Sequence, residues 1–289
     1  MQDGQSDACP SKNPDSYTIT LFTMRQIISL KQRWVEIRNR VDWPLRNAVT
    51  FSPSVSQQPP LSLPTLLEQL SSDQKPLAEV LASRYHLADW GHLFFDRPSF
   101  RESLYVLDIL DRYLDQPDLA QPALDVGCRN GGYLPGLHAW TNGPWDGVEL
   151  DAHRRYWSLT TRRAHGERIA RLLPGCRYIA GNVLDLHHSY GFITWFLPFL
   201  EPEPLQDWGL PLRFLMPLQL LKHVWSLLLP GGRLLVINQD KEEAELQQQL
   251  FQQAGIAAQA LGQIESPLSP FQRRRFGWLA ERSHDQDFR

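Results

Sequence analysis

Cysteine and long hydrophobic runs are scarce in this sequence. Its 289 residues contain three cysteines, Cys9, Cys128 and Cys176, with neither a CxxC pair nor a cysteine and histidine spacing typical of zinc sites. The pattern therefore supports neither a metal site nor a disulfide framework, and it fits a reducing, cytoplasmic setting. The nearest approach to a membrane span, residues 193–200, falls far short of the roughly 18 to 20 apolar residues required. Because the amino terminus also lacks a basic start followed by an apolar signal core, we expect a soluble protein.

An excess of positive charge is also missing. The formal net charge is −3 and the pI is about 6.3, so no sequence-wide positive field would gather nucleic acid. The sequence still allows a local basic patch, because six arginines follow residue 149. They are Arg154, Arg155, Arg162, Arg163, Arg168 and Arg171. The spacing of the first four places them on one helical face, where they would bind an anion or, more commonly, be solvated. A small-molecule or protein partner is therefore favoured over nucleic acid.

Residues 1–60 are expected to comprise a disordered start, an amphipathic helix and a linker. The helix is predicted over about 21–41, where apolar residues recur at steps of three and four, and Pro44 marks its end. Its apolar face consists of Ile27, Leu30, Trp34, Ile37 and Val41. We expect this face to dock on the protein and the basic face to lie in water. The alternative is a basic amphipathic helix that contacts a partner or a membrane surface.

Residues 61–120 are expected to form a helical extension, with helical patterns around residues 77–85 and over about 100–114. The second helix is predicted to begin at a capping box formed by Ser99 and Glu102.

From residue 121 to 289, short apolar strands alternate with helices. Strands are predicted at about 122–126, 145–150, 176–181, 191–196 and 232–238, and helices include 216–228 and 241–254. Such alternation implies right-handed crossovers and a doubly wound, mostly parallel sheet, so the fold class is α/β. Residues 196–218 are too long for a plain connection, and we interpret them as an insertion that covers a substrate.

Two strands end in an acid. Asp125 closes the first predicted strand and is followed by Gly127 and Gly131, which allow positive φ angles and close approach of the backbone to a ligand. Glu149 closes the second, 24 positions later, near the roughly 20-residue spacing at which an acid accepts both hydroxyls of a ribose. Asp151 is the nearby alternative. Together these acids predict a nucleotide-like ligand at the carboxyl edge of the sheet.

This arrangement resembles the class I S-adenosylmethionine-dependent methyltransferase superfamily. The resemblance covers about residues 100–282 and includes a late turn and strand, Leu229-Pro230-Gly231-Gly232 followed by an apolar run. It implies a seven-stranded sheet, closed by segments at about 256–264 and 273–281 with a reversed edge strand. It also implies that S-adenosylmethionine binds along the carboxyl edge and that its methyl group passes to an unidentified acceptor.

The resemblance further implies a set of cofactor-binding residues. They are Asp125, Gly127, Cys128, Arg129, Gly131, Glu149, Leu150, Asn182, Val183 and Trp195. In this assignment Asp125 orders the loop and the cofactor's amino group, Glu149 holds the ribose, and Asn182 and Val183 contact the adenine.

Two positions depart from the family pattern. Arg129 stands where glycine is usual, so its side chain either turns outward or forces a different turn. Asn182 replaces the usual aspartate but keeps an acceptor oxygen, and Asp185 is a register-shifted alternative.

The sequence does not fix a catalytic base. Methyl transfer from a sulfonium depends mainly on alignment and desolvation, and a base is needed only for some acceptors. The weak candidates near the carboxyl edge are His187, His188, Tyr190 and Asp240. Residues 192–199 lack the Asn/Asp-Pro-Pro-aromatic motif of adenine methyltransferases, which disfavours base methylation. A non-catalytic cofactor-binding or scaffold protein of this fold, or an RNA methyltransferase, remains an alternative.

Overall fold

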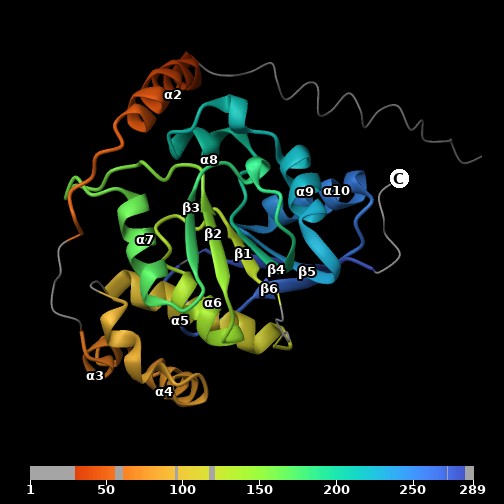
Figure 1. Ribbon diagram of the computed structural model, residues 1–289. Helices are drawn as coiled ribbons and strands as arrows, with labels where there is room; N and C mark the ends of the chain where they lie inside the picture. The colour runs from red at the N-terminus through yellow and green to blue at the C-terminus, as the bar shows by residue number, and fades with distance from the viewer. Residues whose placement is uncertain (1–29, 56–60, 95–96, 117–120, 272, 284–289) are drawn as a thin grey trace, which may run out of the picture.

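A single seven-stranded sheet forms the centre of the protein (Figure 1). The computed structural model describes residues 30–55, 61–94, 97–116, 121–271 and 273–283. The strands are β1 (Ala123–Val126), β2 (Trp145–Glu149), β3 (Arg177–Ala180), β4 (Tyr190–Phe196), β5 (Leu228–Asn238), β6 (Ala258–Ile264) and β7 (Arg275–Glu281). Their spatial order is β3-β2-β1-β4-β5-β7-β6. Strands β1 to β5 pair in parallel, whereas β7 is antiparallel to both neighbours. The predicted α/β fold class, with its reversed edge strand, is confirmed.

Helices cover both faces of this sheet (Figure 1). One face is covered by α5 (Arg97–Tyr113), α6 (Leu134–Thr141) and α7 (Arg162–Leu172), and the other by α9 (Pro217–Ser226) and α10 (Lys241–Ala254). Side chains alternate along the strands: Phe192 of β4 and Leu235 of β5 join the first apolar core, and Ile193 and Leu234 join the second. This alternation explains why the strands read as continuous apolar runs.

Helix α10 matches the predicted range 241–254. The Asp240 carboxylate accepts a hydrogen bond from the backbone N–H of Glu243 at 3.0 Å and caps the helix start. The helix ends at Gly255, whose φ of 69° lies in the left-handed region.

The start of α5 differs from its prediction. The helix begins at Arg97 rather than near residue 100, so Ser99 lies in the first turn and the proposed capping box is wrong. Before it, α3 (Leu63–Leu67), α4 (Lys75–Arg84) and η1 (Leu87–His92) bring buried Leu66, Leu81 and Trp90 into the first core.

Helix α2 (Leu30–Ala48) docks by the face opposite to the predicted one. Its buried residues are Glu36, Asn39 and Trp43, while the predicted apolar face is exposed. The helix also continues through Pro44 instead of ending there. The physical reason is that Asn39 finds two partners on the segment after β4: its side-chain N–H groups donate to the carbonyls of Gln206 at 2.9 Å and Leu210 at 3.2 Å. Predictions for residues 1–29, including Ile27, lie outside the described residues.

None of the described helices is long and apolar enough to cross a membrane.

Close contact between α5 and α6 depends on Gly136. Its backbone N–H donates to the buried Ser103 hydroxyl at 2.7 Å, and a Cβ at this position would lie 2.4 Å from the Ser103 carbonyl oxygen. We expect Gly136→Ala to lower the free energy of unfolding by about 1–3 kcal/mol, because the helices must separate. Urea unfolding measures the change. Gly181→Ala is the control, since its Cβ would meet no atom within 4 Å, and equal stability of both variants would contradict the prediction.

Candidate cofactor site

Asp125 offers a buried acceptor at the carboxyl edge of the sheet. It lies next to the last residue of β1 and is 1% exposed. Its Oδ1 accepts a hydrogen bond from the Thr194 hydroxyl of β4 at 2.8 Å, while Oδ2 has no hydrogen-bond partner among the described residues. Burial raises the pKa of Asp125 to about 7, although the Thr194 hydrogen bond opposes the shift. A buried oxygen without a donor fits a ligand that brings one, such as an ammonium group.

Glu149, the last residue of β2, ties that strand to the loop after β1. Its Oε2 accepts the backbone N–H of Arg129 at 2.8 Å, and its Oε1 accepts the backbone N–H of Asp151 at 2.7 Å. Burial raises the pKa of this carboxyl, and the nearby Arg162 guanidinium, 3.7 Å from Oε1, opposes the shift. Because each carboxylate oxygen accepts more than one hydrogen bond, both retain capacity for a pair of hydroxyl donors.

The loop between β1 and α6 has three residues in the left-handed region. Gly127, Arg129 and Gly131 have φ angles of 75°, 55° and 76°. Arg129 therefore takes a left-handed conformation that favours glycine and is strained for a residue with a Cβ. The side chain turns toward α5, where its guanidinium pairs with Glu102 at 3.2 Å.

Further contacts fix Arg129 in this conformation. The Tyr178 hydroxyl of β3 donates to the Arg129 carbonyl at 2.7 Å, while the Arg129 N–H is held by Glu149. The loop therefore keeps the glycine-type turn with arginine in place. Its neighbour Cys128 is buried, and burial raises the pKa of the thiol well above its usual value, so the thiol is neutral.

The residues predicted to contact adenine lie beyond β3. Asn182 caps the 3-10 turn η2 (Val183–Asp185), and its Oδ1 accepts the Leu184 N–H at 3.1 Å. Val183 and Trp195 are buried in the core beneath α9 and α10. Leu150 packs in a separate apolar cluster that contains Trp43 of α2.

Three of the four candidate bases lie at the wrong edge of the sheet. His187, His188 and Tyr190 come before or at the start of β4, and residues that precede a parallel strand lie at the edge opposite to those that follow it. Tyr190 is buried there and donates to the Asp146 carboxylate at 3.0 Å. Asp240 does follow β5 at the carboxyl edge, where it caps α10.

The first four arginines after Glu149 are not aligned on one helical face, and Arg154, Arg155 and Arg162 bind groups of other segments of the protein. Arg154 and Arg155 precede α7, which begins at Arg162, so the predicted common face is wrong. Arg155 donates to the carbonyls of Val49 and Phe51, at 3.1 and 2.6 Å.

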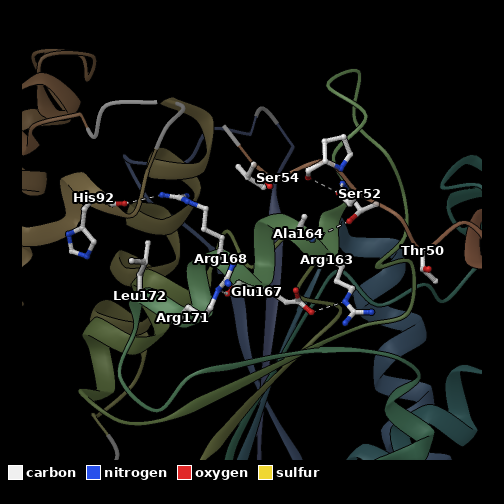
Figure 2. Close-up of a pocket in the computed structure, with 13 residues that line it drawn as sticks. Thr50, Ser52, Ser54, His92, Arg163, Ala164, Glu167, Arg168, Arg171 and Leu172 are labelled. Carbon is white, nitrogen blue, oxygen red and sulfur yellow. Dashed lines mark hydrogen bonds and ion pairs between the residues drawn. The ribbon is translucent and has the colours of Figure 1, made fainter. Parts of the chain in front are cut away.

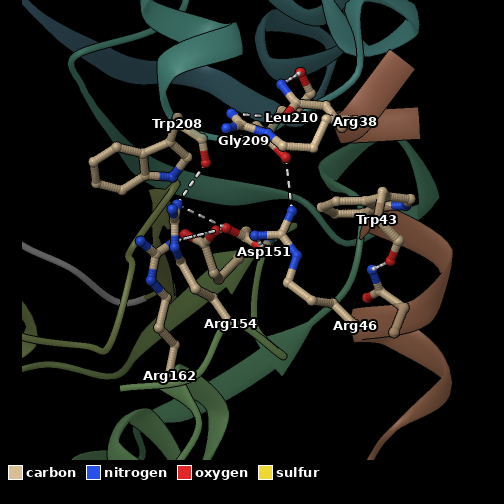
Figure 3. A network of polar contacts seen from close by, with 12 residues as sticks. Arg38, Trp43, Arg46, Asp151, Arg154, Arg162, Trp208, Gly209 and Leu210 are labelled. Carbon is tan, nitrogen blue, oxygen red and sulfur yellow. Dashed lines mark hydrogen bonds and ion pairs between the residues drawn. The ribbon is translucent and has the colours of Figure 1, made fainter. Parts of the chain in front are cut away.

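A buried charge cluster forms around Asp151 (Figure 3). Guanidinium groups of Arg46, Arg154 and Arg162 lie 3.6, 3.4 and 3.3 Å from its carboxylate oxygens. The Arg162 guanidinium also lies over the Trp208 ring, 4.6 Å from the centroid. The cluster connects α2, the loop after β2, and the turn that follows α8 (Pro202–Asp207). It lies next to the carboxylate of Glu149, because Arg162 pairs with both Glu149 and Asp151.

Three residues of this site were not predicted. Thr194 had a signal, since it is a polar residue within an apolar strand. Arg46 lies beyond the predicted end of its helix at Pro44, and Trp208 lies in the segment interpreted only as an insertion. The partners of Arg46 and Trp208 are distant in sequence, so no local pattern identifies these two residues.

A cavity of about 890 Å³ lies along α7, away from these residues (Figure 2). The residues that line it include Thr50, Ser52, His92, Arg163, Glu167, Arg168 and Arg171. Its polar groups contact one another: Arg163 pairs with Glu167 at 2.7 Å, and Arg168 donates to the His92 carbonyl at 3.3 Å. None of the predicted cofactor-binding residues lines this cavity.

Comparisons with known proteins show similarity at the level of the fold. No protein-family model and no curated protein matches the sequence. Among solved structures, a SAM-dependent methyltransferase from Aquifex aeolicus is 18% identical, with a TM-score of 0.46, over 64% of this chain and 93% of its own. A methyltransferase from Pyrococcus furiosus is 14% identical, with a TM-score of 0.45, over 63% and 83%.

A third similar structure is a SAM-bound amino pentose methyltransferase of calicheamicin biosynthesis from Micromonospora echinaspora. It is 16% identical, with a TM-score of 0.42, over 66% of this chain and 98% of its own. These identities and TM-scores are low, and a shared fold by itself does not define a function.

The raised pKa of Asp125 predicts a pH dependence of stability. The folded protein keeps this proton up to about pH 7, whereas an aspartate in the unfolded chain loses it near pH 3.9. Between these values the folded state binds more protons, so the free energy of unfolding falls as pH rises, at most by about 1.4 kcal/mol per pH unit. Other buried carboxyls with raised pKa values, Glu149 and Asp151, act in the same direction.

The Asp125→Asn variant isolates this contribution. We expect urea unfolding between pH 4 and 7 to give a shallower slope for this variant than for the wild type. Asp73→Asn, a substitution at an exposed position, should keep the wild-type slope. Parallel slopes of the wild type and Asp125→Asn would contradict the assignment of a protonated Asp125.

Proposed function

We propose that this protein transfers a methyl group from S-adenosylmethionine to an acceptor, either a small molecule or a protein side chain. The observation that carries the proposal is the unpartnered, buried Oδ2 of Asp125. It lies beside a left-handed loop whose backbone is held by Glu149 across the edge of β1 and β2. The free Asp125 oxygen and the Glu149 carboxylate on the adjacent strand match the ammonium group and the ribose of this cofactor, and a bound ammonium group would stabilise the ionised form of Asp125.

Each residue has a defined part in this proposal. Asp125 would accept from the cofactor's amino group, and Glu149 would accept from the ribose hydroxyls while keeping its bonds to Arg129 and Asp151. Asn182 and Val183 would contact the adenine, with Asn182 sharing an oxygen that already accepts from Leu184. The bound cofactor supplies an electrophilic methyl group on a sulfonium. The protein contributes orientation and exclusion of water, since the loop is fixed before the ligand arrives.

The segments outside the core would cover this site. In the proposed division, residues 1–60 and 61–120 precede a methyltransferase core of residues 121–289, and residues 196–218 form an insertion. Helix α2 and this insertion pack on each other through Asn39 and Trp43. Arg46 of α2 pairs with Asp151, and Trp208 of the insertion contacts Arg162, which also pairs with Asp151. We infer that α2 and the insertion cover the carboxyl edge of the sheet, where the cofactor would bind.

Two rival proposals, a non-catalytic cofactor-binding protein and an RNA methyltransferase, are supported to different degrees by the structure. A non-catalytic cofactor-binding protein is favoured by the placement of the candidate bases, because only Asp240 lies at the carboxyl edge and it caps a helix. RNA methylation loses much of its support, because Arg154, Arg155 and Arg162 bind groups within the protein. Methyl transfer to a nucleophile that needs no protein base therefore remains the preferred function.

Calorimetric titration with S-adenosylmethionine and with its demethylated product tests the cofactor. We expect both to bind, and we expect Glu149→Gln to weaken binding by about 10- to 100-fold, because hydrogen bonds to a charged acceptor are replaced by weaker ones. Glu245→Ala, at a mostly exposed side chain on α10, is the matched control. Circular dichroism verifies that both variants fold.

Failure of the wild type to bind either compound would reject the cofactor proposal. Unchanged affinity of the Glu149 variant would reject the ribose assignment alone. Binding without methyl transfer to any acceptor in a metabolite or protein extract would support the non-catalytic alternative.

A further inference from the structure

Helix α2 presents an apolar surface to solvent because it is docked by its polar side. Its inner face makes directional contacts: Asn39 donates to two carbonyls, and the Glu36 carboxylate accepts the Leu212 N–H at 2.9 Å. The ring of Trp43 packs against Phe214, with 4.9 Å between centroids. Because this face is docked on the protein, no apolar side chain among the described residues covers the opposite side of the helix.

The outward face is continuous along the helix. Leu30, Trp34, Ile37, Val41 and Leu45 follow one another at steps of four, three, four and four, which is the spacing of one helical face. All five are more than half exposed, with Trp34 at 71%. Soluble helices normally turn such a stripe toward the core.

The apolar surface extends onto a neighbouring loop. Val49 and Phe51, also exposed, follow the helix, and Arg155 binds their carbonyls. That contact brings the loop after β2 alongside the segment that follows α2, as Figure 1 also shows. The loop carries the fully exposed side chain of Trp157. We call this surface the apolar strip. It consists of Leu30, Trp34, Ile37, Val41, Leu45, Val49, Phe51, Tyr156, Trp157 and Leu159.

The strip accounts for ten of the twelve large hydrophobic side chains that are exposed among the described residues. Such a concentration marks an interaction site, because exposed apolar residues are otherwise scattered singly over a surface.

Cations flank the strip on both sides of α2. At 100° per residue, Lys31 and Arg38 lie along one margin of the apolar face, and Arg33 and Arg40 along the other. All four are exposed. Of the two acids on α2, Glu36 is turned inward and pairs with Arg40 at 2.6 Å, whereas Asp42 is exposed beside the margin of Lys31 and Arg38. With four cations and these two acids, the margins keep a net positive charge. Long basic side chains at the margins of an apolar face place their charges at the level of lipid headgroups while their stems lie along the acyl region.

From these observations we propose that the apolar strip docks on the surface of an anionic lipid bilayer. The charge of the margins complements anionic headgroups, and two exposed tryptophans suit the membrane interface, where their rings are partly apolar and partly hydrogen-bonded. Helix α2 would lie in the plane of the interface, which fits its many charges. The proposal concerns the outward face of α2 and does not depend on the proposed reaction.

Vesicle co-sedimentation of the full chain tests this proposal. We expect binding to phosphatidylcholine vesicles containing 30% phosphatidylglycerol, much weaker binding to pure phosphatidylcholine, and loss of binding at high salt because the headgroup attraction is screened. The double variant Trp34→Ser, Ile37→Ser should reduce the partition coefficient at least 10-fold. Val80→Ser is the matched control, since Val80 is an equally exposed apolar residue on α4, outside the strip.

Other results would overturn the proposal. One is absence of binding to both kinds of vesicle, and another is equal binding by the double variant. Salt-independent binding to neutral and anionic vesicles alike would reject the role of the cations. Light scattering completes the test: a dimer that the double variant converts to a monomer, without vesicle binding by the wild type, would assign the strip to a second copy of the chain instead.

Discussion

Glu149 accepts two backbone hydrogen bonds, and the geometry of the loops at the carboxyl edge of the sheet depends on them. One bond fixes the loop after β1 at Arg129, and the other fixes the turn after β2 at Asp151. Because the carboxylate is buried, losing either donor would leave a charge poorly compensated. The same side chain therefore shapes the loop and presents the acceptor oxygens, so structure and proposed binding cannot be separated at this position.

Residues distant in sequence stabilise both the strained backbone of Arg129 and the negative charge of Asp151. The left-handed arginine is held by Tyr178 of β3 and Glu102 of α5. Asp151 gathers arginines from α2, from the loop after β2 and from α7. Helices α2 and α5 thus contact the loops after β1 and β2 from distant positions in the sequence, and the backbone strain at Arg129 persists because several contacts over-determine it.

Local patterns predicted the strands and helix α10, because apolar periodicity and end signals such as Asp240 and Gly255 act within a few residues. The docked face of α2 was predicted wrongly, since periodicity identifies an apolar face but not the carbonyls of Gln206 and Leu210 that bind the polar one. Tyr190 lies at the edge opposite to the predicted one, because it is the first residue of β4 and its hydroxyl donates to Asp146 near the start of β2. The cluster around Asp151 depends on contacts across more than a hundred residues, such as Arg46 with Asp151, and no short pattern encodes it.

The inverted docking of α2 affects how the protein would meet a bilayer. An amphipathic helix that hides its apolar side must detach before it can bind lipid, and its binding is then limited by that opening step. Helix α2 needs no such step, since its apolar side already faces outward while Asn39 and Arg46 keep it attached. The whole molecule would therefore arrive as a rigid body in one orientation, with the carboxyl edge of the sheet at a fixed height and tilt above the lipid headgroups.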